Sequence, residues 1–287
     1  MLIDLTGDTV DAEHLAEGYT AHDKSGTYII GTMTSGGGTS GEEYVRWCGK
    51  LSSCSSMFSN NGNISSLDVS NFDTSQVTDM NNMFFYCTAL TSLDVSNFVT
   101  SQVTNMSGMF NNCSSLTSLD VSNFVTSQVT NMGSMFNYCT ALTSLDVSNF
   151  VTSQVTNMSS MFNYCTALTS LDVSNFDTSK VTNMRNMFYH CSSLTSLDVS
   201  NFDTSKVTVA IAMFYGCSAL TNFTSCVFHT SVSFYDSNNL THASLMSIIN
   251  NLATVTTSQT LTIGTTNKAK LTSDEIAIAT NKGLTVA

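Results

Sequence analysis

The sequence predicts an α/β repeat fold: a solenoid with a parallel β-sheet on one face, short helices on the other, and a cap at each end. Three observations lead to this prediction. The phrase LTSLDVSNF occurs five times, first at Leu90–Phe98. Cys87 and Cys113, like Phe84 and Phe110, lie 26 residues apart, and this spacing continues along the array. Within each unit, the apolar pattern changes from alternation to helical spacing. A fixed period of about 20 to 50 residues is typical of stacked repeats.

The first 50 residues are predicted to precede the array as two segments. Residues 1–36 form a small N-terminal attachment segment, and residues 37–50 form a linker and the start of the N-terminal cap. The stretch SGGGTSG at Ser35–Gly41 is typical of a linker. The sequence predicts no strand directly before it, so it is not expected to be a phosphate-binding loop. The array itself is predicted over residues 51–232, and its first unit, Leu51–Leu67, is a degenerate copy of the others.

One unit, Leu116–Ala141, illustrates the elements. Its first nine residues alternate, with Leu119, Val121 and Phe124 on one face and Asp120 among serines on the other. This alternation predicts a short strand that is buried on one side. A turn at VTSQ follows. A set of apolar residues then recurs at helical spacing and predicts a short helix: Val129, Met132, Met135, Phe136 and Cys139. A single unit buries too little to fold alone, so the units must stack.

Residues 233–287 are predicted to cap the C-terminal end of the stack. Leu245, Ile248, Ile249 and Leu252 indicate an amphipathic helix. A strand is expected at Thr260–Gly264. A capping box at Thr272–Glu275 opens a last helix that closes near Gly283, before a final strand at LTV. These elements would shield the open edge of the sheet.

Composition excludes some classes of function. The chain has 287 residues, 42% of them apolar, and only 10% charged residues against about 25% in typical domains. The formal net charge is −12, and no Lys or Arg occurs between Lys50 and Lys180. A nucleic-acid partner is therefore not expected, because binding phosphates requires basic groups. No apolar run is long enough for membrane insertion, and the acidic N-terminus does not resemble a secretory signal.

The pattern L-x-x-L-D-V-S-x-F-x-T-S-x-V-x-x-M-x-x-M-F-x-x-C resembles the BspA-like branch of leucine-rich repeat proteins over roughly residues 51–228. The resemblance implies a leucine-rich-repeat-like solenoid. A phenylalanine such as Phe124 replaces the usual asparagine of the strand motif, as is typical of this branch. The segments Leu15–Met33 and Leu261–Ala287 are similar to parts of phage tail or fibre proteins and phage-associated repeat proteins. They imply a virion-borne protein that recognises a host.

The aspartate of each strand phrase is the main candidate for ligand binding, because the core does not require it. In register, neighbouring carboxylates would lie about 5 Å apart and repel one another. Three interpretations stay open: hydrogen bonds within the turn of each coil, contact with a ligand, or a cation such as Ca²⁺. If repulsion dominates, calcium or a pH near 4 should raise the melting temperature. Catalysis is not expected, since a uniform row gives no distinct acid and base. The row is Asp68, Asp94, Asp120, Asp146, Asp172 and Asp198.

The other chemically notable residues are interpreted as structural or as sites of variation. The cysteines are predicted to be buried thiols, since their spacing fits neither a zinc site nor a disulfide. The five histidines are scattered, and no cofactor is predicted apart from the cation left open for the aspartate row. Two outward positions vary between units. The first position holds Asn81, Ser107, Gly133, Ser159, Arg185 and Ile211. The second position holds Phe85, Asn111, Asn137, Asn163, Tyr189 and Tyr215. They are either unconstrained or the place where binding is diversified.

These observations favour a non-enzymatic recognition protein. The expected function is host binding by a phage tail-associated protein through a bacterial surface glycan or protein, with other tail proteins as partners of the N-terminal segment. The expected location is the virion. The alternative is a bacterial cell-surface adhesin of the same repeat family that binds host proteins.

Overall fold

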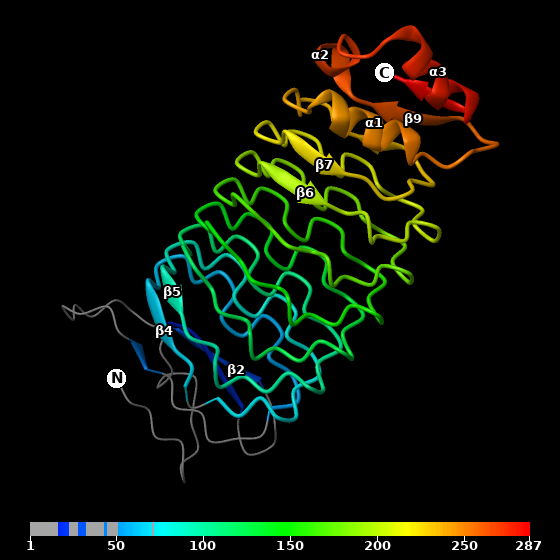
Figure 1. Cartoon of the computed structure of the whole chain (residues 1–287). Coiled ribbons are helices and arrows are strands. Elements are labelled where there is room, and N and C mark those ends of the chain that lie inside the picture. The colour runs from blue at the N-terminus through cyan, green and yellow to red at the C-terminus, as the bar shows by residue number, and fades with distance from the viewer. Residues whose placement is uncertain (1–16, 23–27, 33–42, 45–50, 71) are drawn as a thin grey trace.

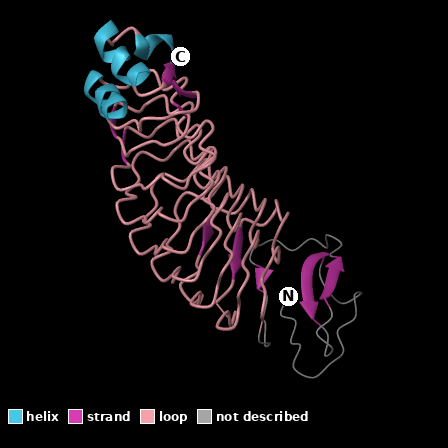
Figure 2. Ribbon diagram, turned by 90° about the vertical axis from the view of Figure 1, so that its right-hand side faces the viewer, coloured by secondary structure: helices cyan, strands magenta, loops and turns pink. Residues whose placement is uncertain are grey.

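The computed structural model describes residues 17–22, 28–32, 43–44, 51–70 and 72–287. From residue 51 onward the chain winds into stacked coils, and the stack ends in a helical C-terminal segment (Figure 1). Figure 2 shows that the described helices gather at this end, whereas turns and loops dominate the coils. Among the described residues, none of the helices combines the length and apolarity needed to span a bilayer.

The described strands are short and mostly parallel. β3 (Glu43–Tyr44), β4 (Ser66–Asp68) and β5 (Ser92–Leu93) pair at one end of the stack, and β6 (Ser196–Asp198) pairs with β7 (Asn222–Thr224) near the other. Leu67 pairs with Leu93, one 26-residue period apart, as the repeat predicts. β1 (Glu17–His22) and β2 (Tyr28–Thr32) form an antiparallel pair within the predicted attachment segment. The rest of that segment, and of the predicted linker apart from β3, lies outside the described residues.

Alternation along the strand phrase is confirmed. Leu119, Val121 and Phe124 are buried, while Asp120 and the serines beside it are exposed. In the middle of the array, however, the phrase forms no continuous strand. Its inter-coil hydrogen bonds there, such as Thr143 N–H to the Thr117 carbonyl, are 3.4–3.5 Å long. The coils are therefore held together mainly elsewhere.

The predicted helix at Val129–Cys139 is wrong, although all five apolar residues of its face are fully buried. The segment forms consecutive turns, in which Ser134 and Tyr138 have positive φ angles of 56° and 57°. Alternate amides point to the next coil, and the N–H groups of these two residues donate to the Ser159 and Asn163 carbonyls at 2.7 Å. An α-helix would use those amides internally. Stacking therefore selects turns over a helix.

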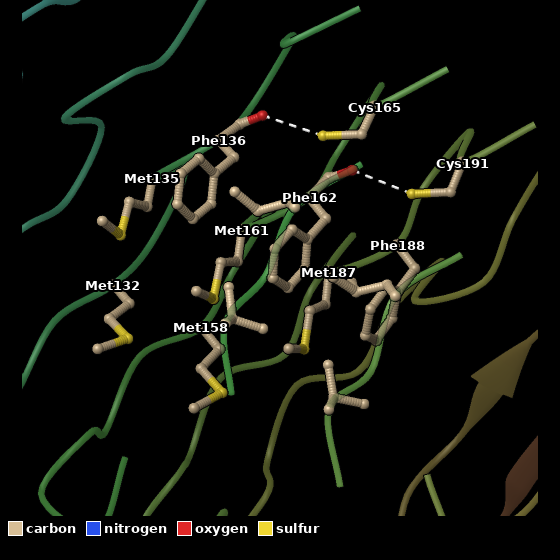
Figure 3. Packing of buried hydrophobic residues seen from close by; sticks show 14 of the residues in the cluster. Met132, Met135, Phe136, Met158, Met161, Phe162, Cys165, Met187, Phe188 and Cys191 are labelled. Carbon is tan, nitrogen blue, oxygen red and sulfur yellow. Dashed lines mark hydrogen bonds between the residues drawn. The ribbon is translucent and has the colours of Figure 1, made fainter. Parts of the chain in front are cut away.

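A ladder of phenylalanines runs through the core at one ring per coil. Neighbouring rings from Phe58 to Phe214 are stacked with centroids 5.5–5.8 Å apart. Methionines pack beside the rings (Figure 3). Cysteine thiols border this ladder, and the Sγ of Cys165 donates to the Phe136 carbonyl of the preceding coil at 3.2 Å (Figure 3). The predicted buried, unbridged thiols are confirmed for the eight described cysteines. Cys48 lies outside the described residues.

Two polar side chains of each repeat connect neighbouring coils. The Nδ2 of Asn149 donates to three carbonyls of the preceding coil, those of Val121, Ser122 and Phe124, at 2.9–3.2 Å. The buried hydroxyl of Thr126 donates to the Val151 carbonyl and accepts from the Val151 N–H. Equivalent bonds recur along the array. The asparagine and threonine that recur in each repeat therefore supply hydrogen bonds between neighbouring coils.

The C-terminal segment packs against β7, the strand of the last coil. It contains β8 (Val232–Ser233), α1 (His242–Asn250), β9 (Gln259–Thr262), α2 (Gly264–Lys268), α3 (Ser273–Asn281) and β10 (Leu284–Val286). The hydroxyls of Ser244 and Ser247 in α1 accept hydrogen bonds from the N–H groups of Phe223 and Ser225. These two amides belong to the last coil, so they have no following coil to bond to. The capping box of Thr272 and Glu275 is confirmed, whereas α2 was not predicted.

Candidate recognition surface

The aspartate row lies on the exposed side of the strand phrase. In each coil, one carboxylate oxygen accepts the N–H of the serine two residues later, as between Asp120 and Ser122 at 2.9 Å. The same bond, at 2.8–2.9 Å, forms at Asp68, Asp94, Asp146, Asp172 and Asp198. Of the three interpretations, hydrogen bonding within the turn therefore has direct structural support.

Hydrogen bonds also dominate the electrostatics of three central carboxylates, those of Asp94, Asp120 and Asp146. Bonds from Ser122 lower the pKa of Asp120, and the repulsion from Asp94 and Asp146 that opposes this effect is smaller. Hydrogen bonds from Ser96 and Ser148 likewise lower the pKa values of Asp94 and Asp146. These directions favour the opposite of the expected stabilisation near pH 4, because a carboxyl group with a lowered pKa loses its stabilising contribution as pH falls.

Neither metal binding nor acid–base catalysis gains support from this geometry. Within the part of the chain that the structure describes, no group of three or more His, Cys, Asp or Glu side chains is arranged to hold a metal ion. Asp68 and Asp172 have lowered pKa values, as do Asp94, Asp120 and Asp146. A general acid would need a carboxyl group whose pKa is raised. Ligand contact along the row stays a prediction.

A second exposed feature is an aromatic strip that crosses successive coils at the turns. We define it as Tyr138, Tyr164, Tyr189, His190, Tyr215 and Tyr235. Tyr138 and Tyr235 are 40% and 47% exposed, and the other four are partly exposed. Large side chains exposed in a continuous row are uncommon on a soluble surface and typically mark an interaction site.

The rings of the strip are in continuous contact. Tyr138 stacks on Tyr164 with centroids 4.5 Å apart, and Tyr164 stacks on His190 at 4.9 Å. A neighbouring column continues from Tyr189 to Tyr215 at 4.9 Å and on to Tyr235 at 5.5 Å. Tyr189 contacts His190 edge-on at 4.6 Å and joins the two columns.

The turns fix the direction of these side chains. Tyr138, Tyr164 and His190 have positive φ angles of 54–57°, which most residues rarely adopt. Their N–H groups donate to the next coil at 2.7–2.8 Å, and this bonding holds the conformation. Gly216 follows in the same position, where an added Cβ would lie 2.7 Å from the His190 Nδ1. The glycine thus leaves room for the His190 ring.

The strip also perturbs its own hydroxyl groups. Burial, followed by the proximity of Tyr164, raises the pKa values of Tyr138 and Tyr189. A hydrogen bond to Asp236 raises the pKa of Tyr215. The raised pKa values keep the phenols of Tyr138, Tyr189 and Tyr215 protonated at neutral pH, and a protonated phenol can both donate and accept hydrogen bonds.

Sequence reasoning located this surface only in part. Tyr189 and Tyr215 belong to a predicted variable position, but Asn163 at that position is only 9% exposed, so the position is not uniformly outward. The predicted helix gave no reason to expect that Tyr189 and Tyr215 contact the column formed by Tyr138, Tyr164 and His190. A comparison of units at both adjacent positions would have shown aromatic residues in successive coils.

The fold and its surfaces define a class: repeat proteins whose 26-residue units stack with small parallel sheets and few short helices. The profile of the family described as "Mycoplasma protein of unknown function, DUF285" matches residues 52–145 and 139–246. These ranges cover more than half of the chain, which therefore belongs to this family. The match is consistent with the expected BspA-like repeat. A search of curated proteins found no match.

Proposed function

We propose that the protein is a non-enzymatic recognition protein, carried on a phage tail, that binds a glycan or protein on a bacterial surface. The observation that carries this proposal is the aromatic strip. Tyr138 and Tyr235 are the exposed ends of a row of contacting rings. Rigid repeat stacks are suited to such extended binding surfaces. The phage location is supported by the terminal resemblances in the sequence.

We further propose that each coil is a variant of the leucine-rich repeat. The buried Leu119 and Val121 match the strand of that repeat, and parallel pairing of Leu67 with Leu93 supports it. Consecutive turns take the place of the usual helix in this variant. Such a coil keeps a constant interior while its turn residues vary.

A bacterial cell-surface adhesin is the second candidate function. The family match favours it, since the family is described from Mycoplasma, a cellular organism. A tail gene beside the coding sequence would favour the phage location, and an export signal upstream would favour the adhesin.

Binding of the labelled full-length protein to intact bacteria tests the proposal. A panel of Gram-positive and Gram-negative cells, purified wall polysaccharides and immobilised extracellular host proteins covers both candidates. We expect saturable binding to at least one bacterial surface, competed by unlabelled protein. Binding confined to host proteins would instead support the adhesin. Absence of saturable binding to every member of the panel would refute a recognition role.

A further inference from the structure

The aromatic strip offers an unusual set of groups to a ligand. Tyr138 and Tyr164 are within 14° of parallel, and Tyr189 and Tyr215 within 13°, so neighbouring rings cover one another's faces. The groups left for a ligand are ring edges and phenol hydroxyls. They recur once per coil, at the ring spacing of 4.5–5.5 Å.

Charge and ring geometry disfavour ionic ligands. A cation binds over the face of an aromatic ring, and those faces are covered within the strip. An anionic polymer would be repelled by a protein whose formal net charge is −12. The strip is therefore suited to an uncharged ligand.

The backbone disfavours an extended peptide. Peptides that add to a surface as a strand need free main-chain donors and acceptors. The amides of Tyr138, Tyr164 and His190 donate to the next coil, and those of Tyr189 and Tyr215 donate within their own turns. The Tyr235 N–H donates to the Ser233 hydroxyl at 3.3 Å. All six amides of the strip are thus occupied.

The narrow shape of the strip disfavours a globular partner. It is one ring wide at Tyr138 and Tyr164 and widens to two only at Tyr189 and His190. A stable interface between globular proteins buries about 800 Å² on each side. A narrow row of contacts fits a linear molecule that lies along it.

We propose that the aromatic strip binds a neutral, linear glycan lengthwise, with about one sugar unit per coil. This inference rests on the proposed recognition function and names its ligand class. A sugar unit in an extended polysaccharide advances by a length similar to the ring spacing. Its hydroxyls can pair with phenol oxygens that donate and accept hydrogen bonds. Contacts repeated at each coil make the affinity depend on ligand length.

Other coils of the chain carry asparagine at the positions of the strip tyrosines, so asparagine is a suitable substitution for a test. Asn60 and Asn112 occupy the position of Tyr138 and Tyr164 with the same positive φ, and Asn111 occupies that of Tyr189 and Tyr215. The variant Y138N/Y164N/Y189N/Y215N should therefore keep the backbone, which circular dichroism melting would verify. Calorimetric titration of the full chain with α-1,6-glucose and β-1,4-N-acetylglucosamine oligomers, from disaccharide to octasaccharide, measures binding.

We expect one of these series to bind with an affinity that rises with oligomer length. The tyrosine variant should lose about tenfold or more in affinity for the longest oligomer. Two controls should retain the wild-type affinity. Y86N changes an exposed tyrosine outside the strip, and D94N/D120N/D146N removes charge from the strand side while keeping the oxygen acceptors.

Four outcomes would overturn the inference. They are affinity independent of oligomer length, an unchanged affinity in the tyrosine variant, a loss confined to the aspartate variant, and absence of glycan binding. If the protein still binds bacteria and protease treatment of the cells abolishes binding, the ligand is a protein and the proposed function survives. If no bacterial surface is bound, the proposed function fails as well.

Discussion

Each aspartate of the strand phrase begins a turn that a hydrogen bond within the same coil closes. The Asp120 carboxylate accepts the Ser122 N–H, and the same geometry recurs from Asp68 to Asp198. This local hydrogen bond explains why both the aspartate and the serine recur in every repeat, and the explanation does not require a ligand. The sequence showed that the core does not need the aspartate, but the turn partner became clear only with the backbone in place.

The lowered pKa values predict how pH acts on stability. A carboxyl group whose pKa is lower in the folded protein stabilises the fold above its unfolded pKa, and this contribution is lost as pH falls through the folded pKa. We expect the melting temperature to fall as pH is lowered from about 6 to about 3. The pKa shifts of Asp94, Asp120 and Asp146 contribute to this fall. Replacing all three by asparagine should reduce the slope, since asparagine keeps the acceptor but does not titrate. A higher melting temperature near pH 4 would contradict the structure.

The cysteine ladder should be chemically inert in the folded protein. Burial raises the pKa of the Cys139 and Cys217 thiols to about 12, and each Sγ donates to a carbonyl of the preceding coil. We expect the eight described thiols to resist a water-soluble alkylating reagent at mildly alkaline pH until the protein unfolds. Peptide mapping by mass spectrometry would identify each labelled site. Labelling of the ladder in the native state at the rate of free cysteine would contradict the structure.

Asn163 provides a test of buried polar groups. Its Oδ1 is buried and, among the described residues, has no hydrogen-bonding partner. Replacing an unsatisfied polar side chain by an apolar one of similar size removes a desolvation cost. We expect Asn163→Leu to raise the free energy of unfolding by about 1 kcal/mol in urea titrations. Asn111→Leu is the matched control, because the Asn111 Oδ1 accepts from Asn137 and its loss should give no gain.

At the scale of elements, burial was more predictable than hydrogen bonding. The pattern from Val129 to Cys139 identified the core correctly, because the same side chains face inward in a helix and in the observed turns. The choice between them depends on whether amides bond within the coil or to the next coil. Ser134 and Tyr138 themselves give no signal of positive φ, and only glycines at the equivalent positions of other coils, Gly108 and Gly216, indicate it.

The C-terminal cap should be sensitive to two hydroxyls. Ser244 and Ser247 accept the outward N–H groups of Phe223 and Ser225 in and beside β7. Replacing both serines by alanine leaves these amides unsatisfied, at about 1–3 kcal/mol for each buried group. We expect a lower free energy of unfolding in urea titrations and more self-association by analytical ultracentrifugation. Thr285→Ala, on an exposed position of β10, should change neither.

At the scale of the whole molecule, the repeat made the stack predictable. Equivalent residues such as Leu67 and Leu93 lie side by side because the period is constant. The aromatic strip was not predictable in the same way. Its two columns occupy adjacent positions in the unit and meet through contacts between Tyr164, Tyr189 and His190.

Deleting whole coils tests this arrangement. Removal of residues 91–116 places Tyr86 in the coil next to Tyr138 and should lengthen the strip, because Asn112 otherwise separates them. Removal of residues 143–168 takes away the same number of residues and should shorten the strip by Tyr164. Since coils contact mainly their neighbours, both proteins should fold and melt within a few degrees of each other. Glycan affinity should rise in the first protein and fall in the second. Equal affinities would contradict lengthwise binding.

The direction of the hydrogen bonds between coils makes the two ends of the array different. At the turns, amides such as that of Phe136 donate toward the C-terminal end, whereas Thr130 and its equivalents donate toward the N-terminal end. At the turns, the C-terminal end of the array therefore exposes N–H donors where the N-terminal end exposes carbonyl acceptors. Two N-terminal ends, or two C-terminal ends, would place donors against donors and acceptors against acceptors. An N-terminal end and a C-terminal end would pair donors with acceptors. An array stripped of both caps should consequently polymerise head to tail into open filaments rather than close into dimers.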